Sequence, residues 1–324
     1  MDQEIYPGGN AQDEDRMPGG SAAPPPSPEE EDRMPGSPPR PSFLGRLKSR
    51  KWLVFALMGL AGGAAGAFVA EIAPGAGDEA KFAEIAVKTG IWAAMAASLL
   101  ATSLFWANDI YNRHRFGPKS AQRGILTGLI GGFLAGGVAE AMFQKLQSDD
   151  MGDATLYIVY CACWAVLGLL LGISFSRSVP NLSIWRGILA GVVGGAVGGF
   201  GFVSLSGVEV FPGMVARMVG IGTLGFALGL AIVVIEAAFR EASLEVVWAP
   251  NENTFFNLGS EPIYIGGGND DQVFVRGLAP RFSHIVFKDG AIEYVETESQ
   301  NRTPLRNESA LQIGTLKLVV HAAN

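Results

Sequence analysis

Cysteine and histidine are scarce in this sequence of 324 residues, which has two cysteines and three histidines. Cys161 and Cys163 lie in one apolar run, so neither a disulfide framework nor a zinc site is predicted. His114, His284 and His321 are far apart in the sequence, and no HExxH, nucleophile–base or P-loop pattern surrounds them. We therefore expect a protein that is not an enzyme and that uses no metal and no cofactor.

Charged residues are also few, at 17% of the chain, and the net charge is −7. Acidic residues gather toward the two ends and leave no broad basic stripe, so nucleic-acid binding is not expected. Residues 1–45 hold most of the prolines, repeat the hexapeptide EDRMPG at 14–19 and 31–36, and have almost no large apolar side chains. Such a segment cannot bury enough surface to offset its ordering entropy, which predicts a disordered acidic tail.

Apolar residues and glycine are abundant instead, with 48% hydrophobic residues and 43 glycines. Between residues 46 and 240 we find six apolar stretches, each long enough to cross a hydrocarbon core of about 30 Å as a helix. They are residues 52–72, 85–106, 124–143, 155–175, 187–206 and 215–235. The expected fold begins with an α-helical membrane bundle of six transmembrane helices, built as three hairpin repeats.

Basic residues are distributed unevenly around these stretches. They cluster before the first stretch and in the second and fourth connections, and Arg240 follows the sixth, whereas the other connections have few. Because cytoplasmic loops carry the excess of Lys and Arg, we predict a multi-pass protein of the cell (inner) membrane with both termini in the cytoplasm.

One glycine pattern, GxxGG, recurs in the first, third and fifth stretches. Its members are Gly59, Gly62, Gly63, Gly128, Gly131, Gly132, Gly191, Gly194 and Gly195. Small residues three and four apart share one helix face and allow close backbone approach, so these glycines are predicted to pack helices together. We expect a glycine-zipper bundle with pseudo-threefold symmetry in which helices one, three and five lie inside.

Ionisable residues are confined to the ends of the apolar stretches, where Glu71, Lys88, Glu140 and Arg217 lie. Pairing of Glu71 with Lys88, or of Glu140 with Arg217, would compensate their charges, and snorkelling to the membrane interface is the alternative. No charged residue occupies mid-depth, where transport pathways usually place one. The pattern therefore favours an anchor over a transporter.

The sequence changes character from about residue 244 to residue 324. Short β-rich runs at 244–248, 263–265, 273–275, 283–288, 291–296, 303–305 and 316–320 alternate with turn formers such as Lys288-Asp289-Gly290. Several short strands within about 80 residues are typical of a small all-β sandwich.

The run from Ile265 to Val319 resembles the forkhead-associated (FHA) family, whose sandwiches read phosphothreonine peptides through their loops. The resemblance rests on Ile265-Gly266 with Asn269-Asp270, on His284, on Asp289-Gly290, on Ser299-x-Asn301-x-Thr303 with Asn307, and on Leu311-x-x-Gly314. It implies that Asn301 holds a peptide backbone, and that His284 and Gly314 are structural.

The sequence departs from the family at two positions that would contact phosphate. The family's arginine after the first glycine is Gly267 here, and its serine three residues before the histidine is Arg281. Losing two charged hydrogen bonds would cost about 3–6 kcal/mol, so phosphothreonine reading is expected to be degraded unless Arg276 or Arg281 compensates. The candidate peptide-binding or phosphopeptide-binding residues are Gly266, Gly267, Arg276, Arg281, Ser283, Ser299, Asn301 and Arg302.

Together these features predict a membrane-anchored scaffold or signalling adaptor that presents an FHA-like module to a cytoplasmic protein or phosphoprotein. The alternative is a channel or transporter with a pore along the pseudo-threefold axis, regulated by that module. The lipid bilayer is the other expected partner, and the sequence also allows a homo-oligomer.

Overall fold

A computed structural model describes residues 50–73, 81–147, 153–177, 179–206, 213–250, 252–268, 270–314 and 316–322. The predicted acidic tail, residues 1–45, and Asn269 of the FHA-like pattern lie outside these residues.

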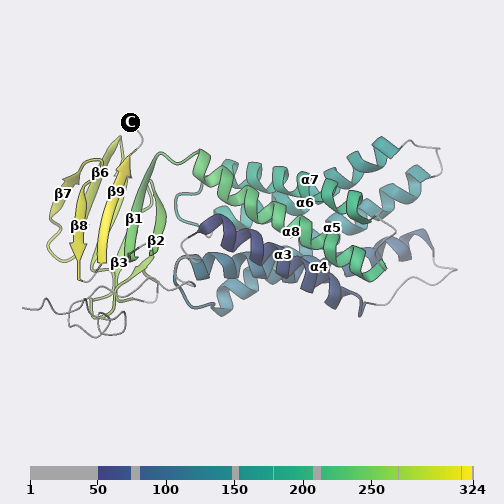
Figure 1. Ribbon diagram of the computed structural model, residues 1–324, viewed down its shortest axis with the longest axis horizontal. Coiled ribbons are helices and arrows are strands. Elements are labelled where there is room, and N and C mark those ends of the chain that lie inside the picture. Colours follow the sequence, from purple (N-terminus) through teal and green to yellow (C-terminus); the bar gives the residue numbers. More distant parts are fainter. Residues whose placement is uncertain are drawn as a thin grey trace, which may run out of the picture. The chain divides into compact units, whose positions relative to one another are not determined.

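Six helices in the described residues are long and apolar enough to cross a membrane (Figure 1). They are α3 (Lys51–Ala70), α4 (Phe82–Tyr111), α5 (Pro118–Gln147), α6 (Asp153–Ser176), α7 (Ile184–Ser206) and α8 (Gly213–Ala238). Large apolar side chains also point away from the bundle, among them Ile130, Val197 and Phe200, each more than half exposed. An apolar exterior is what a lipid environment requires, so the fold is that of a multi-pass membrane protein.

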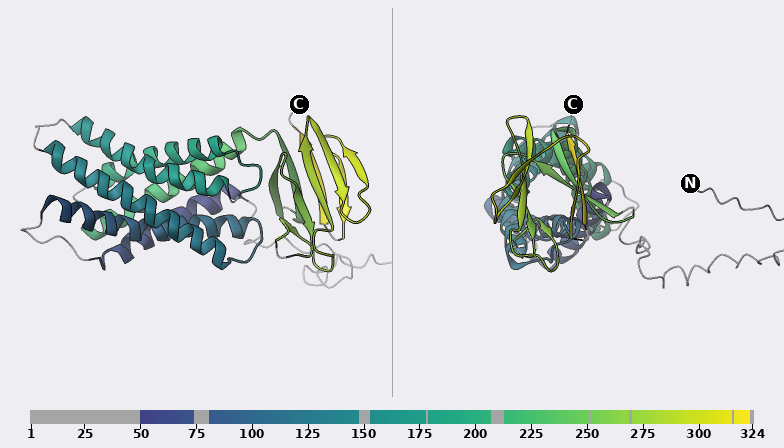
Figure 2. Two further views of the ribbon diagram at one scale, coloured as in Figure 1. Left: turned by 180° about the vertical axis from the view of Figure 1, so that it is seen from behind. Right: turned by 90° about the vertical axis from the view of Figure 1, so that its left-hand side faces the viewer.

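The helices form a closed ring in chain order, because α3 packs against both α4 and α8. The left view of Figure 2 shows the helices running along one another from behind. Among the described residues, the closely packed neighbours always join an odd-numbered with an even-numbered helix, most closely α4 with α5, α6 with α7, and α3 with α8. The expectation that helices one, three and five (α3, α5 and α7) lie innermost is therefore wrong.

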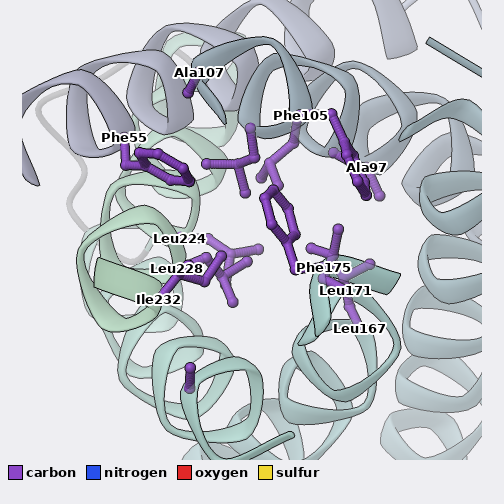
Figure 3. Packing of buried hydrophobic residues seen from close by; sticks show 14 of the residues in the cluster. Phe55, Ala97, Phe105, Ala107, Leu167, Leu171, Phe175, Leu224, Leu228 and Ile232 are labelled. Atoms are coloured by element: carbon purple, nitrogen blue, oxygen red, sulfur yellow. The ribbon is translucent and has the colours of Figure 1, made fainter. Parts of the chain in front are cut away.

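The centre of the ring is filled by large side chains from the even-numbered helices. Leu100 of α4, Leu171 of α6 and Leu228 of α8 are fully buried in one apolar cluster. One turn further along the same helices lie Leu104, Phe175 and Ile232, which belong to the same cluster. Figure 3 shows Leu171, Phe175, Leu228 and Ile232 converging from opposite sides of the ring, with Phe55 of α3 beside them. The odd-numbered helices contribute mainly alanine to this cluster, at Ala67, Ala135 and Ala190, apart from Val54 and Phe55 of α3.

The three GxxGG segments make corresponding contacts. In each segment, a Cβ added to the first glycine would lie 1.9–2.4 Å from a backbone carbonyl oxygen of the even-numbered helix that precedes it around the ring. These first glycines are Gly59, Gly128 and Gly191, and a Cβ on Gly128 would also lie 2.3 Å from a Cα. A Cβ on the last glycine, Gly63, Gly132 or Gly195, would lie 2.3–2.4 Å from the carbonyl oxygen one turn away on that helix. Only a residue without a Cβ allows such close backbone approach. Each GxxGG segment thus joins one hairpin to the hairpin before it.

Residues 242–322, which we call the β module, form two sheets around one apolar core. The four-stranded sheet has the order β2-β1-β9-β8 and the five-stranded sheet has the order β4-β3-β5-β6-β7. The bounds are β1 (Ala242–Ala249), β2 (Glu252–Leu258), β3 (Ile263–Gly266), β4 (Val273–Phe274), β5 (Ser283–Lys288), β6 (Ala291–Glu296), β7 (Arg302–Leu305), β8 (Ala310–Ile313) and β9 (Leu316–Ala322). The seven predicted runs correspond to strands, whereas β2 and β8 were missed. The fold class predicted from sequence, a helical membrane bundle followed by a small all-β domain, is confirmed.

Hydrogen bonds join the β module to the connections between helices. The Tyr111 hydroxyl at the end of α4 accepts a hydrogen bond from the backbone N–H of Phe255 in β2, at 2.8 Å. Asn181, between α6 and α7, donates to the backbone oxygens of Asn257 and Glu261, both at 3.0 Å. Strand β2 and the residues that follow it are thus tied to the bundle, and His114, after α4, also lies 3.1 Å from the backbone oxygen of Asp271 between β3 and β4.

Candidate functional site

The FHA-like candidate residues gather at one end of the five-stranded sheet. Strand β3 is antiparallel to β5, β5 to β6, and β6 to β7, so the end of β3, the start of β5, the end of β6 and the start of β7 lie together. The backbone N–H of Thr297, after β6, donates to the backbone oxygen of Phe282, before β5, at 3.1 Å. The loop that follows β3 lies at this end of the sheet, and the loop that follows β6 lies here too, beside the segment that precedes β5.

A buried carboxylate braces the first of these loops. Asp271 accepts hydrogen bonds from the backbone N–H groups of Gly268, at 2.7 Å, and Arg281, at 3.0 Å. Gly266 and Gly267 pack so closely on the segment that follows β4 that a Cβ would lie 2.6 Å from the backbone oxygen of Ala279 or 2.1 Å from that of Leu278. These two glycines hold the loop's shape rather than opening a space for a ligand.

Arg281 presents its guanidinium at the surface, over an aromatic ring. Its Cζ lies 4.9 Å from the centre of the Tyr264 ring, and that ring lies 5.4 Å from the ring of His284 on the next strand. Burial and the positive charge of Arg302 lower the pKa of His284, so its imidazole is neutral near pH 7. The His284 ring thus packs against the Tyr264 ring of the neighbouring strand.

The second loop, between β6 and β7, carries the polar candidates that remain exposed. Ser299 Oγ donates to the Glu296 carboxylate at 2.8 Å and accepts from the backbone N–H of Asn301 at 3.2 Å, which shapes a tight turn. The Asn301 side chain is exposed, and Arg302 lies 3.4 Å from Glu293 across the strand pair. This sheet end thus presents the Asn301 amide and the Arg302 guanidinium at the surface.

Two candidates differ in exposure. Ser283 is fully buried, and its hydroxyl has no hydrogen-bond partner among the described residues, so it faces the core and not a peptide. Arg276, in contrast, is exposed after β4. Gly314, at φ 59°, occupies the left-handed region that favours glycine and supports the turn between β8 and β9.

A second cluster of polar groups surrounds a cavity near the start of α8, whereas the β module follows the end of α8. This cavity, which we call the vestibule, has a volume of about 390 Å³ and is lined by residues of all six helices or their ends. Arg217 of α8 donates two hydrogen bonds of 2.7 Å to the Glu71 carboxylate, which also accepts one from the Trp92 indole at 3.3 Å. The hydrogen bonds from Arg217 lower the pKa of Glu71, because they stabilise the carboxylate.

The structure shows a different pairing from the two that the sequence allowed beside snorkelling: Glu71 bonds with Arg217. Lys88 pairs with Glu84 one turn earlier in α4, and Glu140 accepts a hydrogen bond from Gln144 in its own helix, each at 2.7–2.8 Å. Glu71, the acid of the first pair considered, thus bonds with Arg217, the base of the second, because α8 packs beside α3 in the closed ring.

A buried ion pair at the opposite end of the bundle was also missed. Lys51 Nζ lies 2.5 Å from the carboxylate of Glu236, whose side chain is almost fully buried, and Asn257 of β2 donates to the same carboxylate. In the sequence, Lys51 directly precedes the first apolar stretch, and Glu236 directly follows the sixth. An acid directly after an apolar stretch is the signal that could have revealed it.

Comparison of the chain with protein-family models, with curated proteins and with solved structures gives no match.

Proposed function

We propose that this protein is a membrane-anchored scaffold or signalling adaptor whose FHA-like β module binds a cytoplasmic protein. The observation that carries the proposal is the exposed loop between β6 and β7, which presents Asn301 and Arg302 at the same sheet end as Arg281. A two-sheet sandwich with binding loops at one end is the architecture that the FHA resemblance implies. The basic residues around the helix ends support a cytoplasmic location of the module and an inner-membrane location of the chain.

The peptide contacts would come from few groups. Asn301 suits recognition of a peptide backbone, because its amide both donates and accepts hydrogen bonds. Ordinary phosphothreonine reading is weakened, since Gly267 and Arg281 occupy the positions where the family has its phosphate-contacting arginine and serine. Arg281 is the group best placed to meet an acidic or phosphorylated residue, because a guanidinium fork matches such oxyanions.

Peptide arrays probed with the full-length protein in lipid nanodiscs test this proposal. We expect Asn301→Ala to abolish binding to threonine peptides, and Gln312→Ala, which removes an exposed amide from the other sheet, to preserve it. Binding that requires phosphothreonine at micromolar strength and is lost in Arg281→Ala would contradict the degraded site. Failure of the parent protein to bind any peptide would remove the adaptor function.

The alternative function, a channel or transporter along the ring axis, has less support. The axis is occupied by buried apolar layers such as Leu100, Leu171 and Leu228, which offer no polar path to an ion. Proteoliposome flux distinguishes the two functions. Solute movement that stops when Gly132 or Gly195 is enlarged would favour transport over the adaptor.

The matching contacts of the three GxxGG segments support an origin of the bundle from three hairpin repeats joined as a glycine zipper. In that arrangement the repeats provide a rigid membrane anchor, and the function resides in the module that follows them.

A further inference from the structure

A cavity at the junction of the bundle and the β module is larger than the vestibule. This junction cavity has a volume of about 1500 Å³, more than the roughly 300–1,000 Å³ of a typical small-molecule pocket. The bundle contributes the start of α5, the connection between α6 and α7, and the residues that follow α8. The module contributes residues 257–261 and the turn between β5 and β6. Asn181, in the connection between α6 and α7, makes three hydrogen bonds to the module and so holds the two sides together.

Basic side chains outnumber acidic ones in the wall of this cavity. Six Lys and Arg side chains line it, against four Asp and Glu side chains. The bases are Lys119, Arg123, Arg177, Arg186, Arg240 and Lys288, and the acids are Glu241, Glu261, Asp270 and Asp289. The cavity is therefore positive in a chain whose net charge is −7.

Three of these bases already have partners. Arg186 pairs with Glu241, the acid that follows α8, at 2.8 Å. Arg240 donates a hydrogen bond of 2.9 Å to a side-chain oxygen of β2. Arg123 is attracted by Asp109, a buried acid of α4. The positive charge that is left belongs to the other three bases.

Two of those three bases, Lys119 and Arg177, lie on the bundle side of the cavity. Both are exposed, and no ion pair joins either of them to an acid within the described residues. Thr127 Oγ1 donates to Ser174 Oγ at 2.8 Å, so the start of α5 and the end of α6, which carry these bases, lie side by side. The third base, Lys288, belongs to the module, where the remaining acids also lie. The unpaired positive charge is thus greatest on the bundle side.

The starts of two helices add to the positive potential of that side. Lys119 and Ser120 in the first turn of α5 line the cavity, and so do Ser183 and Ile184 where α7 begins. The first N–H groups of a helix have no intrahelical acceptor, and the helix dipole gives this end a partial positive charge. Both effects favour an anion beside the two unpaired bases.

The depth of these bases matches that of lipid phosphates. The candidate membrane span of α5 begins at Pro118 and that of α6 ends at Ser176, so Lys119 and Arg177 lie where the spans meet the head-group region. A phosphate monoester carries a charge of about −1.5 to −2 and three acceptor oxygens, which match two bases and free N–H donors.

We propose that the junction cavity binds a phosphate monoester on its bundle side, beside Lys119 and Arg177. The monoester is either the head group of an anionic lipid or a soluble phosphate ester, since both present the same group. The inference concerns the junction and is independent of peptide binding by the FHA-like end of the module.

Native mass spectrometry of the full-length protein in detergent micelles tests the proposal. Dioleoyl phosphatidic acid should bind at least about tenfold more tightly than dioleoyl phosphatidylcholine, whose choline cancels the charge and covers the phosphate. Equal binding of the two lipids would overturn the proposal.

Variants locate the site. The double variant Lys119→Gln/Arg177→Gln should weaken binding of phosphatidic acid at least about tenfold, because each base near the membrane surface contributes about fivefold. Arg50→Gln/Arg115→Gln is the matched control, since it removes two exposed bases before α3 and α5 that do not line the cavity. It should bind as the parent does. An unchanged affinity of the first variant, or an equal loss in the control, would show attraction to the whole surface and overturn the site.

Competition identifies the source of the phosphate. Glycerol 3-phosphate is the head group of phosphatidic acid without its acyl chains. If the natural ligand is a soluble ester, glycerol 3-phosphate should displace phosphatidic acid from the parent protein. If the ligand is a lipid, a large excess should leave the lipid bound, because the acyl chains contribute to the affinity. Either result, together with the loss in Lys119→Gln/Arg177→Gln, supports the phosphate site and assigns its occupant.

Discussion

The close approach of α4 and α5 predicts opposite outcomes for two glycines on the same helix. A Cβ on Gly132 would lie 2.4 Å from the carbonyl oxygen of Ala93 and 2.7 Å from the Cβ of Ala97. A Cβ on Gly137 would lie 3.4 Å from the nearest atom, the carbonyl oxygen of Ala86, which is ordinary contact. Gly132→Ala should therefore force the helices apart, and Gly137→Ala should not.

The magnitude follows from the difference between the two variants. Both changes improve helix propensity by up to about 1 kcal/mol, and this gain cancels in the comparison. Overpacking a tight contact costs about 1–3 kcal/mol, so Gly132→Ala should be less stable than Gly137→Ala by that amount. At the corresponding positions of α3 and α7, Gly63→Ala and Gly195→Ala should behave like Gly132→Ala, because a Cβ there would lie 2.3–2.4 Å from a carbonyl oxygen.

Reversible unfolding in mixed micelles, followed by far-ultraviolet circular dichroism, measures the difference. A Gly132→Ala variant as stable as Gly137→Ala would refute the close packing of α4 on α5.

Three other changes probe the structure elsewhere. Glu236→Ala should destabilise the fold by about 3–5 kcal/mol because it leaves the Lys51 ammonium buried and unpaired, and adding Lys51→Met should recover much of the loss in the same unfolding assay. The pKa of His284 is lower in the folded protein, so the unfolded chain binds more protons below pH 6.5. The free energy of unfolding should therefore fall as the pH drops from 6.5 through the pKa of the folded state. A His284→Gln variant that keeps the same pH dependence would contradict this expectation. Asn181→Ala should speed hydrogen exchange at residues 257–261, where Asn181 makes three hydrogen bonds, without changing exchange in β5 and β6, and uniform exchange changes would argue against a local role.

The sequence predicts the helices well and their arrangement poorly. An apolar run of membrane-spanning length suffices to locate a helix, although α4 extends to Tyr111, beyond the predicted end at 106, because its polar end continues the backbone hydrogen bonding. Small residues indicated close packing correctly, but they were placed at the centre. A glycine stripe permits contact with a neighbouring helix and cannot fill a central space, which instead requires leucine and phenylalanine from the helices between.

Contacts between distant segments explain the other errors. The Glu71–Arg217 pair depends on the first and last helices of the bundle meeting, which no local pattern encodes. Strand β2 was missed because Glu252, Asn253 and Asn257 disfavour strands. Nevertheless Phe256 and Leu258 of β2 belong to the apolar core of the module. Glu252 and Asn257 bond with Arg113 after α4 and with Glu236 of α8. At the FHA-like end, the sequence identified an exposed Asn301 and could not foresee that Ser283 points inward, since that depends on the register of β5.

The side of the membrane on which the β module lies tests the adaptor function most directly. In a background with Cys161→Ala and Cys163→Ala, single cysteines replace exposed Glu298 in the module or exposed Lys81 at the start of α4. In intact cells, a membrane-impermeant maleimide should label the Lys81→Cys protein, and it should label the Glu298→Cys protein only after the membrane is permeabilised. Labelling of Glu298→Cys in intact cells would place the module outside the cytoplasm and contradict the proposed function.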